Sequence, residues 1–131
     1  MAKKANNPFA RTLISNANMD PAQKFRIEEA YKSIRTNIML SILKKGCKTI
    51  VVSSGSPAEG KTTTTINLAI SIAQADQRVL LIDADPQANA TQSLLPPGEY
   101  NTLAGLLTIP DAYYDDLLYH SSIRGLDVLP A

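Results

Sequence analysis

Hydrophobic residues recur at helical spacing in the first third of the chain. They are Ile27, Tyr31, Ile34, Ile38 and Ile42, separated by four, three, four and four residues. This periodicity is typical of an amphipathic helix with one apolar face. Asp20 and Pro21 stand where a helix prefers its N-cap and its first residue, and Gln23 can complete a capping box. We therefore expect a long helix that begins at these residues and ends near Gly46.

Two short apolar runs flank a second segment that is more uniformly apolar. Lys48–Ser54 (KTIVVSS) and Arg78–Asp83 (RVLLID) are rich in branched aliphatic residues and are bounded by polar ones, which is typical of strands. Thr62–Ala75, between them, is apolar on nearly all sides, as in a helix packed between two layers. The order strand, helix, strand predicts a parallel βαβ unit with a right-handed crossover.

The remaining segments carry weaker patterns. Met1–Met19 has no hydrophobic periodicity and is predicted to be a flexible N-terminal arm. After Asp85 the chain is rich in Pro, Asn and Gly, so a loop is expected there. His120, the only histidine, is expected at the surface. Two short helices and a third strand are predicted at Thr102–Leu107, Ala112–Leu118 and Leu126–Leu129.

Composition and charge fit one soluble domain or part of one. The chain has 131 residues, 44% of them hydrophobic, and a net charge of +1, so no overall field favours nucleic acid or an anionic membrane. Cys47 is the only cysteine, which excludes an internal disulfide, and its place before an apolar run predicts a buried side chain. No apolar run approaches the ~20 residues of a membrane span. We therefore expect a cytoplasmic location.

A phosphate-binding signature lies between the first predicted strand and the helix that follows. Gly55–Thr62 (GSPAEGKT) matches the P-loop spacing G-x-x-x-x-G-K-[ST]. The predicted nucleotide-binding residues are Gly55, Ser56, Pro57, Ala58, Glu59, Gly60, Lys61, Thr62 and Thr63. Successive backbone N–H groups would cradle phosphates, Lys61 would reach the β- and γ-phosphates, and the Thr62 hydroxyl would bind Mg²⁺. ATP and Mg²⁺ are therefore the predicted cofactors.

Two aspartates follow the second predicted strand. Asp83 and Asp85 end the run VLLIDAD, and the carboxyl ends of neighbouring parallel strands meet at one edge of a sheet. We expect both carboxylates to face the P-loop, where one could hold a Mg²⁺-bound water or accept a proton from an attacking hydroxyl. The same residues also suit a second interpretation, in which they are turn or capping aspartates. A third interpretation treats the run as an ordinary Walker B strand.

Several stretches resemble the bacterial tyrosine kinases of the capsular and exopolysaccharide type, within the ParA/MinD-type P-loop ATPases. They are Glu28–Ser41 (EEAYKSIRTNIMLS), Ser53–Gln74, Val79–Asp85 and Gly125–Ala131 (GLDVLPA). The resemblance implies a protein-tyrosine autokinase that regulates polysaccharide synthesis. It implies Lys61 as a catalytic residue and Thr62 as a metal ligand, with Asp83 as a metal ligand or catalytic base and Asp85 as a supporting catalytic residue.

The same resemblance implies partners. In these kinases, acidic and basic residues of the helix before the first strand lie at a ring-forming subunit interface, and Glu29, Lys32 and Arg35 take those places here. Lys32 stands where the family usually has Arg, whose bidentate fork a Lys cannot reproduce. The alternative is a solvated helix face with i,i+3 ion pairs. Such kinases also have a membrane-embedded polysaccharide co-polymerase as activator, which would recruit the chain to the inner face of the membrane.

A second family, the chromosome- and plasmid-partition ATPases, is the alternative. Asp85–Thr91 (DPQANAT) resembles their segment after the second strand, and Gln87 stands where the kinases would have Arg. Ser56, however, replaces the lysine that partition ATPases carry after the first P-loop glycine. This alternative implies ATP-dependent binding of nucleic acid, which the kinase interpretation does not.

Both families place a further strand with a Walker B aspartate after the third strand, and the kinases add a tyrosine-rich tail. Ala131 precedes both features, so residues 20–131 are expected to be the N-terminal part of a P-loop ATPase or kinase domain. The predicted fold is α/β, a P-loop NTPase-like three-layer α/β/α arrangement with a mostly parallel sheet, incomplete at the C-terminus. A third hypothesis is a nucleotide-binding fragment without catalysis.

Overall fold

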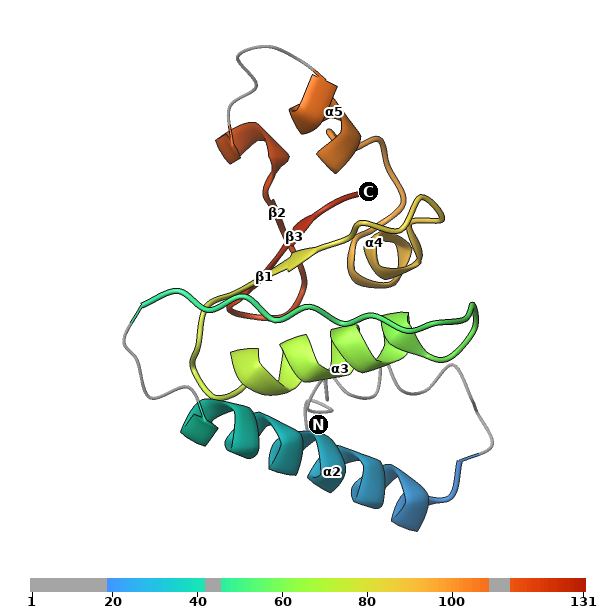
Figure 1. Ribbon diagram of the computed structural model, residues 1–131, viewed down its shortest axis with the longest axis vertical. Coiled ribbons are helices and arrows are strands. Elements are labelled where there is room, and N and C mark those ends of the chain that lie inside the picture. The colour runs from blue at the N-terminus through green and yellow to red at the C-terminus, as the bar shows by residue number, and fades with distance from the viewer. Residues whose placement is uncertain (1–18, 42–45, 109–113) are drawn as a thin grey trace, which may run out of the picture. The chain divides into compact units, whose positions relative to one another are not determined.

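The computed structural model describes residues 19–41, 46–108 and 114–131. The predicted N-terminal arm, apart from Met19, and the predicted end of the first helix at residues 42–45 lie outside these ranges. The chain divides into two compact units, Met1–Ser71 and Ile72–Ala131 (Figure 1).

The first unit contains the predicted long helix, α2, at Pro21–Ser41. The Asp20 carboxylate accepts a hydrogen bond from the Ala22 N–H at 3.3 Å, and the Gln23 side-chain oxygen accepts one from the Asp20 N–H at 3.3 Å. This reciprocal pair is the capping box that the sequence predicts, and it fixes the start of the helix. Neither α2 nor any other helix in the described ranges is long and apolar enough to cross a membrane.

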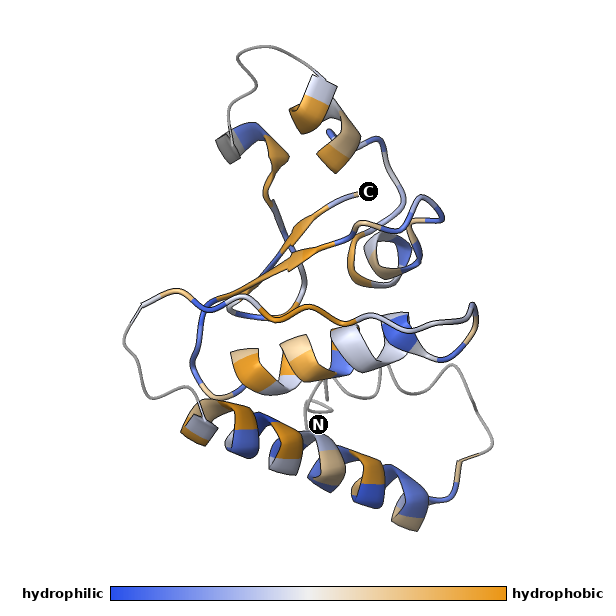
Figure 2. Cartoon of the chain, in the orientation of Figure 1, coloured by the Kyte–Doolittle hydropathy of each residue, from blue (hydrophilic) through white to orange (hydrophobic). Residues whose placement is uncertain are grey.

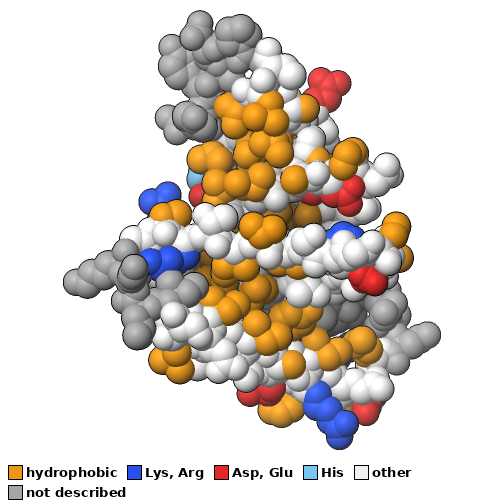
Figure 3. Space-filling view, viewed as in Figure 1, with side chains coloured by type: hydrophobic (Ala, Val, Ile, Leu, Met, Phe, Trp, Pro, Cys, Tyr) orange, Lys and Arg blue, Asp and Glu red, His pale blue; other side chains and the backbone are white. Residues whose placement is uncertain are grey.

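The apolar face of α2 is only partly covered. Ile27, Tyr31 and Ile38 are half-buried, and no residue of the helix is fully buried. Phe25 and Leu40 are 64% and 66% exposed. Hydrophobic and hydrophilic residues are mixed around α2 in Figure 2, and hydrophobic side chains reach the surface along this helix in Figure 3. The helix forms as predicted, but its apolar stripe is not sealed by a core.

The helix α3 spans Lys61–Ala73. Its buried apolar residues include Ile66, Leu68, Ala69 and Ile70, as expected for a helix that is apolar on nearly all sides. The Arg35 guanidinium of α2 donates to the carbonyl oxygen of Ser71 at 3.0 Å. Since Ser71 lies in the last turn of α3, the cation also complements the negative end of the helix dipole. Arg35 thus joins α2 to α3, which lie side by side in Figure 1.

The prediction of a strand at Lys48–Ser54 is wrong. These residues form no strand, and most of them are exposed, with Val51 at 83%. A strand needs hydrogen bonds from a neighbouring strand. The described residues of this unit, 19–41 and 46–71, contain helices but no strand that could supply them. Cys47, predicted to be buried, is exposed beside this unpaired segment. The first strand of the predicted βαβ unit is therefore not formed.

The second unit is built on a mixed sheet in the order β1–β3–β2. The strands are β1 at Val79–Ile82, β2 at Tyr119–His120 and β3 at Leu126–Leu129. β3 pairs in parallel with β1 and antiparallel with β2. The strands predicted at 78–83 and 126–129 are confirmed. The sequence does not predict β2, because a strand of two residues is too short to show an alternating pattern.

Short helices complete the second unit: α4 at Asn89–Leu94, α5 at Leu103–Thr108 and the 3-10 helix η1 at Tyr114–Leu117. α5 and η1 agree with predicted helices, whereas α4 lies where a loop was predicted. The buried apolar side chains of this unit include Leu81, Ala90, Leu94, Leu95, Leu117, Leu126, Val128 and Leu129. They come from strands and helices alike, and hydrophobic residues follow β1 and β3 in Figure 2.

A glycine at the turn before β3 allows the parallel pair to form. Gly125 has a φ of +82°, and a Cβ at this residue would lie 3.1 Å from the carbonyl oxygen of Gln77. The Gly125 carbonyl accepts the Val79 N–H at 2.8 Å, which begins the β1–β3 pairing. The turn therefore needs both a left-handed backbone and the absence of a side chain.

Gly125→Ala is expected to lower the free energy of unfolding by about 1–3 kcal/mol, because the left-handed backbone and the close carbonyl both oppose a Cβ. Chemical denaturation of the full chain measures the change. Gly98→Ala is the matched control, since a Cβ there would only reach ordinary contact with Tyr100 at 3.6 Å. Equal stability of the two variants would contradict this account of the turn.

Candidate functional site

The P-loop motif leads directly into α3, as its spacing predicts. Residues 55–60 form turns and bends, and Lys61 is the first residue of the helix. Gly60 has a φ of +84°, a left-handed conformation that glycine adopts without a Cβ clash. The Thr64 N–H donates to the Gly60 carbonyl at 2.9 Å. The amides that precede Thr64 in this turn have no acceptor within the helix and are available to an anion.

The loop leaves open space beside this helix end. A Cβ built on Gly55 or on Gly60 would meet no atom of residues 19–41, 46–108 or 114–131 within 4 Å. Backbone without side chains at the start of a 13-residue helix offers N–H donors and the positive end of the helix dipole together. This arrangement can hold the phosphate groups of a nucleotide.

The Lys61 ammonium group is anchored to the loop. Its Nζ donates to the Ser54 hydroxyl at 2.8 Å and to the Ser56 carbonyl oxygen at 3.0 Å. The Ser54 hydroxyl in turn donates to the same carbonyl at 3.0 Å. Because an ammonium group has three N–H donors, one remains for a phosphate oxygen. Ser54 was not predicted as a site residue, because it precedes the motif and its only signal is a hydroxyl beside the first glycine.

Glu59 braces the same part of the loop. Its carboxylate accepts a hydrogen bond from the Ser56 N–H at 3.3 Å. The Ser56 carbonyl oxygen also accepts hydrogen bonds from Ser54 and Lys61. The Ser56 backbone is therefore held at both its N–H and its carbonyl group. Ser56 and Glu59, both predicted to bind nucleotide, therefore also give the loop its shape.

The loop offers a hydroxyl of the kind that can bind Mg²⁺. No cluster of three or more His, Cys, Asp or Glu side chains within residues 19–41, 46–108 and 114–131 could hold a metal ion. Mg²⁺ keeps several waters and needs only one or two protein ligands besides substrate phosphates. Thr62 is half-buried in the first turn of α3 and offers a hydroxyl beside the amides that are predicted to bind phosphate. The residues present thus fit a magnesium ion that arrives with the nucleotide.

Asp83, directly after β1, is buried and 5% exposed. Its Oδ2 accepts two hydrogen bonds from Thr91, one from the N–H and one from the hydroxyl, each at 2.8 Å. Its Oδ1 accepts the N–H of Asp85 at 3.2 Å. A carboxylate has about four lone-pair positions. Most of the accepting capacity of Asp83 is therefore used by the segment that follows it.

Asp85 is half-buried and has a freer side chain. Its Oδ1 accepts the Gln87 N–H at 3.0 Å, and its Oδ2 accepts no hydrogen bond from the part of the chain that the structure describes. These are the geometries of turn and capping aspartates, which the sequence also allowed. That Asp83 and Asp85 face the P-loop, which belongs to the other unit, stays a prediction.

The α2 residues predicted at a subunit interface make contacts within their own unit. Lys32 and Glu29 form an i,i+3 ion pair at 2.7 Å between side chains that are 44% and 48% exposed. Such an exposed pair contributes only about 0.2–0.5 kcal/mol to helix stability. Arg35 is bound to the carbonyl of Ser71. The interface itself stays a prediction.

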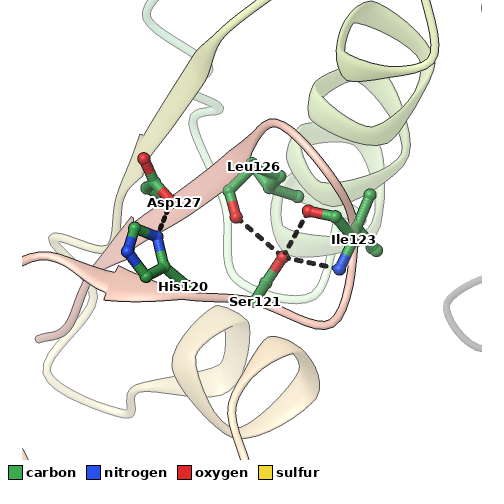
Figure 4. A network of polar contacts seen from close by, with 5 residues as sticks. All are labelled: His120, Ser121, Ile123, Leu126 and Asp127. Carbon is green, nitrogen blue, oxygen red and sulfur yellow. Dashed lines mark hydrogen bonds and ion pairs between the residues drawn. The ribbon is translucent and has the colours of Figure 1, made fainter.

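Another polar network closes the turn between β2 and β3 (Figure 4). His120 Nδ1 lies 2.6 Å from Asp127 Oδ1 across the paired strands. The Ser121 hydroxyl lies 2.8 Å from the Leu126 carbonyl oxygen and accepts the Ile123 N–H at 3.1 Å. The His120 side chain is 88% exposed, as predicted. The network therefore supports a surface turn rather than a buried reactive group.

Comparison with known proteins places these features in a family. Residues 47–131 match the family model AAA_31, described as an AAA domain. The chain is 47% identical to the tyrosine-protein kinase YwqD of Bacillus subtilis (strain 168) over 57 residues, which cover 44% of this chain and 24% of that protein. It is 30% identical to CapB of Staphylococcus aureus over 131 residues, which cover all of this chain and 54% of that protein. It is 35% identical to the sporulation initiation inhibitor protein Soj of Bacillus subtilis (strain 168) over 85 residues, which cover 64% of this chain and 34% of that protein.

A solved structure extends the comparison. The crystal structure of the chimerical protein CapA2B2 matches with a TM-score of 0.62 and 27% identity, over 92% of this chain and 50% of that chain. The chain thus spans about half the length of CapB and a smaller share of YwqD and Soj. The predicted α/β fold of the P-loop NTPase type is confirmed. The matched range contains the P-loop, both aspartates and β3, and the chain belongs to the AAA_31 family of P-loop NTPase domains.

Proposed function

We propose that this chain is the ATP-binding part of a bacterial protein-tyrosine kinase that regulates capsular or exopolysaccharide synthesis. The observation that carries the proposal is the anchored Lys61 at the start of α3, beside open space at Gly55 and Gly60. Phosphoryl transfer is catalysed mainly by positioning phosphates and neutralising their charge, and this loop is built for both. The similarity to the kinase YwqD over 57 residues supports the choice of reaction.

The chain's own residues would act as follows. The amides at the start of α3 would bind phosphate oxygens, and Lys61 would donate its remaining N–H to the β- or γ-phosphate. Thr62 would hold Mg²⁺, which neutralises phosphate charge when bound. Asp85 would accept the proton of an attacking tyrosine hydroxyl through its free oxygen. Asp83, already bound by three donors, would support Asp85, which reverses the roles that the resemblance implies.

The proposal includes a place and partners. The kinase would work in the cytoplasm, at the inner face of the membrane, with a membrane-embedded polysaccharide co-polymerase as activator. Glu29, Lys32 and Arg35 would contribute to a subunit interface, which the exposed Phe25 and Leu40 of the same helix support.

Charge reversal at Glu29 is then expected to shift the chain from oligomer to monomer, with MgATP present. Sedimentation velocity measures this, and an unchanged distribution would rule out the α2 interface.

Transfer of labelled phosphate tests the proposed reaction. The full chain is incubated with MgATP labelled at the γ-phosphate and with a tyrosine-containing peptide as acceptor, and phosphoamino acids are then separated. A kinase is expected to place label on tyrosine, in the chain or in the peptide. If ATP is bound but label never reaches tyrosine, even with the activator present, the chain is not a kinase.

A partition ATPase is the second candidate. The segment Asp85–Thr91 (DPQANAT) and the similarity to Soj over 85 residues favour it. This function predicts DNA binding that depends on ATP and weakens with salt. DNA binding that responds to neither would exclude it. ATP binding with neither phosphotyrosine nor DNA binding would leave the third candidate, a nucleotide-binding protein without catalysis, which any measurable ATP turnover excludes.

A further inference from the structure

One buried carboxylate and one buried hydroxyl connect three segments of the second unit. Asp83 follows β1, and its Oδ2 accepts both the N–H and the hydroxyl of Thr91, in α4. The Thr91 oxygen also accepts the N–H of Ala131, which follows β3, at 3.3 Å. Asp83 and Thr91 are 5% and 6% exposed. These bonds are therefore shielded from competition by water.

The start of α4 depends on this contact. Its N-cap residue, Ala88, has a φ of +52° and makes no side-chain capping bond. The Thr91 N–H belongs to the first turn, whose amides have no acceptor within the helix. Asp83, which directly follows β1 and precedes Thr91 by eight residues, accepts this N–H. This cap ties the start of α4 to the end of β1, which a cap from the adjoining residue would not do.

The same carboxylate fixes the backbone of Asp85. Asp83 Oδ1 accepts the Asp85 N–H at 3.2 Å, and the Asp85 carbonyl accepts the Ala88 N–H at 2.8 Å. The backbone of Asp85 is thus held on both sides. Loss of the contact between Asp83 and Thr91 would release both ends of the segment that carries Asp85.

We propose that Asp83 and Thr91 are a positioning pair, which holds Asp85 in the orientation that phosphoryl transfer requires. The contact itself stands on the geometry, and its consequence for catalysis rests on the proposed function. All three partners of Asp83 are hydrogen-bond donors, so an ionised carboxylate suits the position and an amide would not. Thr91 contributes the hydroxyl that completes the pair.

Three variants of the full chain separate positioning from general stability. Thr91→Val keeps the branched shape and removes the hydroxyl, and Thr91→Ser restores it. Ser93→Ala is the matched control, because the Ser93 hydroxyl donates only to the Asn89 carbonyl on the exposed face of the same helix. Hydrogen exchange of individual amides is measured without nucleotide, and ATP affinity and turnover are measured separately.

In Thr91→Val, the hydrogen-exchange rates of the Asp85 and Ala131 amides are expected to rise at least about tenfold, because the segments that carry them are released. The same substitution is expected to lower turnover about 10- to 100-fold while ATP affinity stays within about twofold, since misplacement of a catalytic group affects the reaction more than binding. Thr91→Ser should recover most of both effects, and Ser93→Ala should show neither.

Unchanged exchange of the Asp85 and Ala131 amides in a folded Thr91→Val variant would overturn the pair, whatever its activity. A wild-type turnover in that variant, or a loss of ATP affinity as large as the loss of turnover, would overturn its role in positioning. If the wild-type chain turns over no ATP even with the activator present, the proposed function fails instead. The exchange measurement then still decides whether the two residues hold the segment.

Discussion

Lys61→Ala is expected to lower ATP turnover at least about 100-fold, the usual loss when one fixed donor to developing charge is removed. The loop amides would still contact phosphate, but the charge that reaches the β- and γ-phosphates would be lost. ATP affinity should fall as well, because Lys61 is already held in place by Ser54 and Ser56 and contacts phosphate without further ordering. Calorimetric titration with MgATP and a turnover assay measure the two effects.

The hydrogen bond between Lys61 and Ser54 gives a second, smaller expected effect on ATP affinity. Ser54→Ala removes one acceptor of the Lys61 ammonium group but keeps its charge, so the loss of ATP affinity should be smaller, about tenfold or less. Lys48→Ala removes an exposed lysine outside the motif and is expected to change nothing. If Lys61→Ala binds and turns over ATP like the wild type, the loop does not hold the nucleotide.

Asp85→Asn is also expected to cause a large loss of turnover. An amide of the same shape can still accept the Gln87 N–H but cannot take up a proton from an attacking hydroxyl. Turnover should therefore fall about 100- to 10,000-fold, as for the loss of a general base, with the affinity for ATP within about twofold of the wild type. Comparison of the two parameters in the same assays shows whether Asp85 acts in the reaction step.

Asp76→Asn is the control for this substitution. Asp76 is an exposed turn residue of the same unit with a φ of +57°, a conformation that asparagine tolerates. Its activity should match the wild type. A turnover of Asp85→Asn equal to that of Asp76→Asn would remove Asp85 from the mechanism and leave the attacking hydroxyl without a base.

Local signals in the sequence were sufficient for two parts of the molecule. The capping box at Asp20 and Gln23 and the P-loop before α3 both depend on residues within a few positions of one another, and both form as predicted. β3 was also predicted with its correct limits, because Leu126–Leu129 is a short apolar run bounded by Gly125 and Pro130. Such features need little information from distant parts of the chain.

Features that depend on a distant partner were not predictable in the same way. Lys48–Ser54 has the composition of a strand, but the described part of its unit contains no strand with which it could pair. The segment after Asp85 has the composition of a loop, yet α4 lies there, capped by Asp83 at the end of β1. The sequence showed the two aspartates but not which carboxylate accepts several hydrogen bonds from its own chain. Only the bonds to Thr91 distinguish a buried Asp83 from a freer Asp85.

Titration of the labelled full chain with MgATP, followed by NMR, shows whether the loop before α3 holds the phosphates of ATP. We expect saturable shifts of the amide signals of Gly60, Lys61 and Thr62, which Lys61→Ala weakens and Lys48→Ala leaves unchanged. Amides of α2 away from the loop should move little. If the P-loop amides do not shift at saturating MgATP, or shift equally in Lys61→Ala, the loop is not a nucleotide site and the proposed kinase function is wrong.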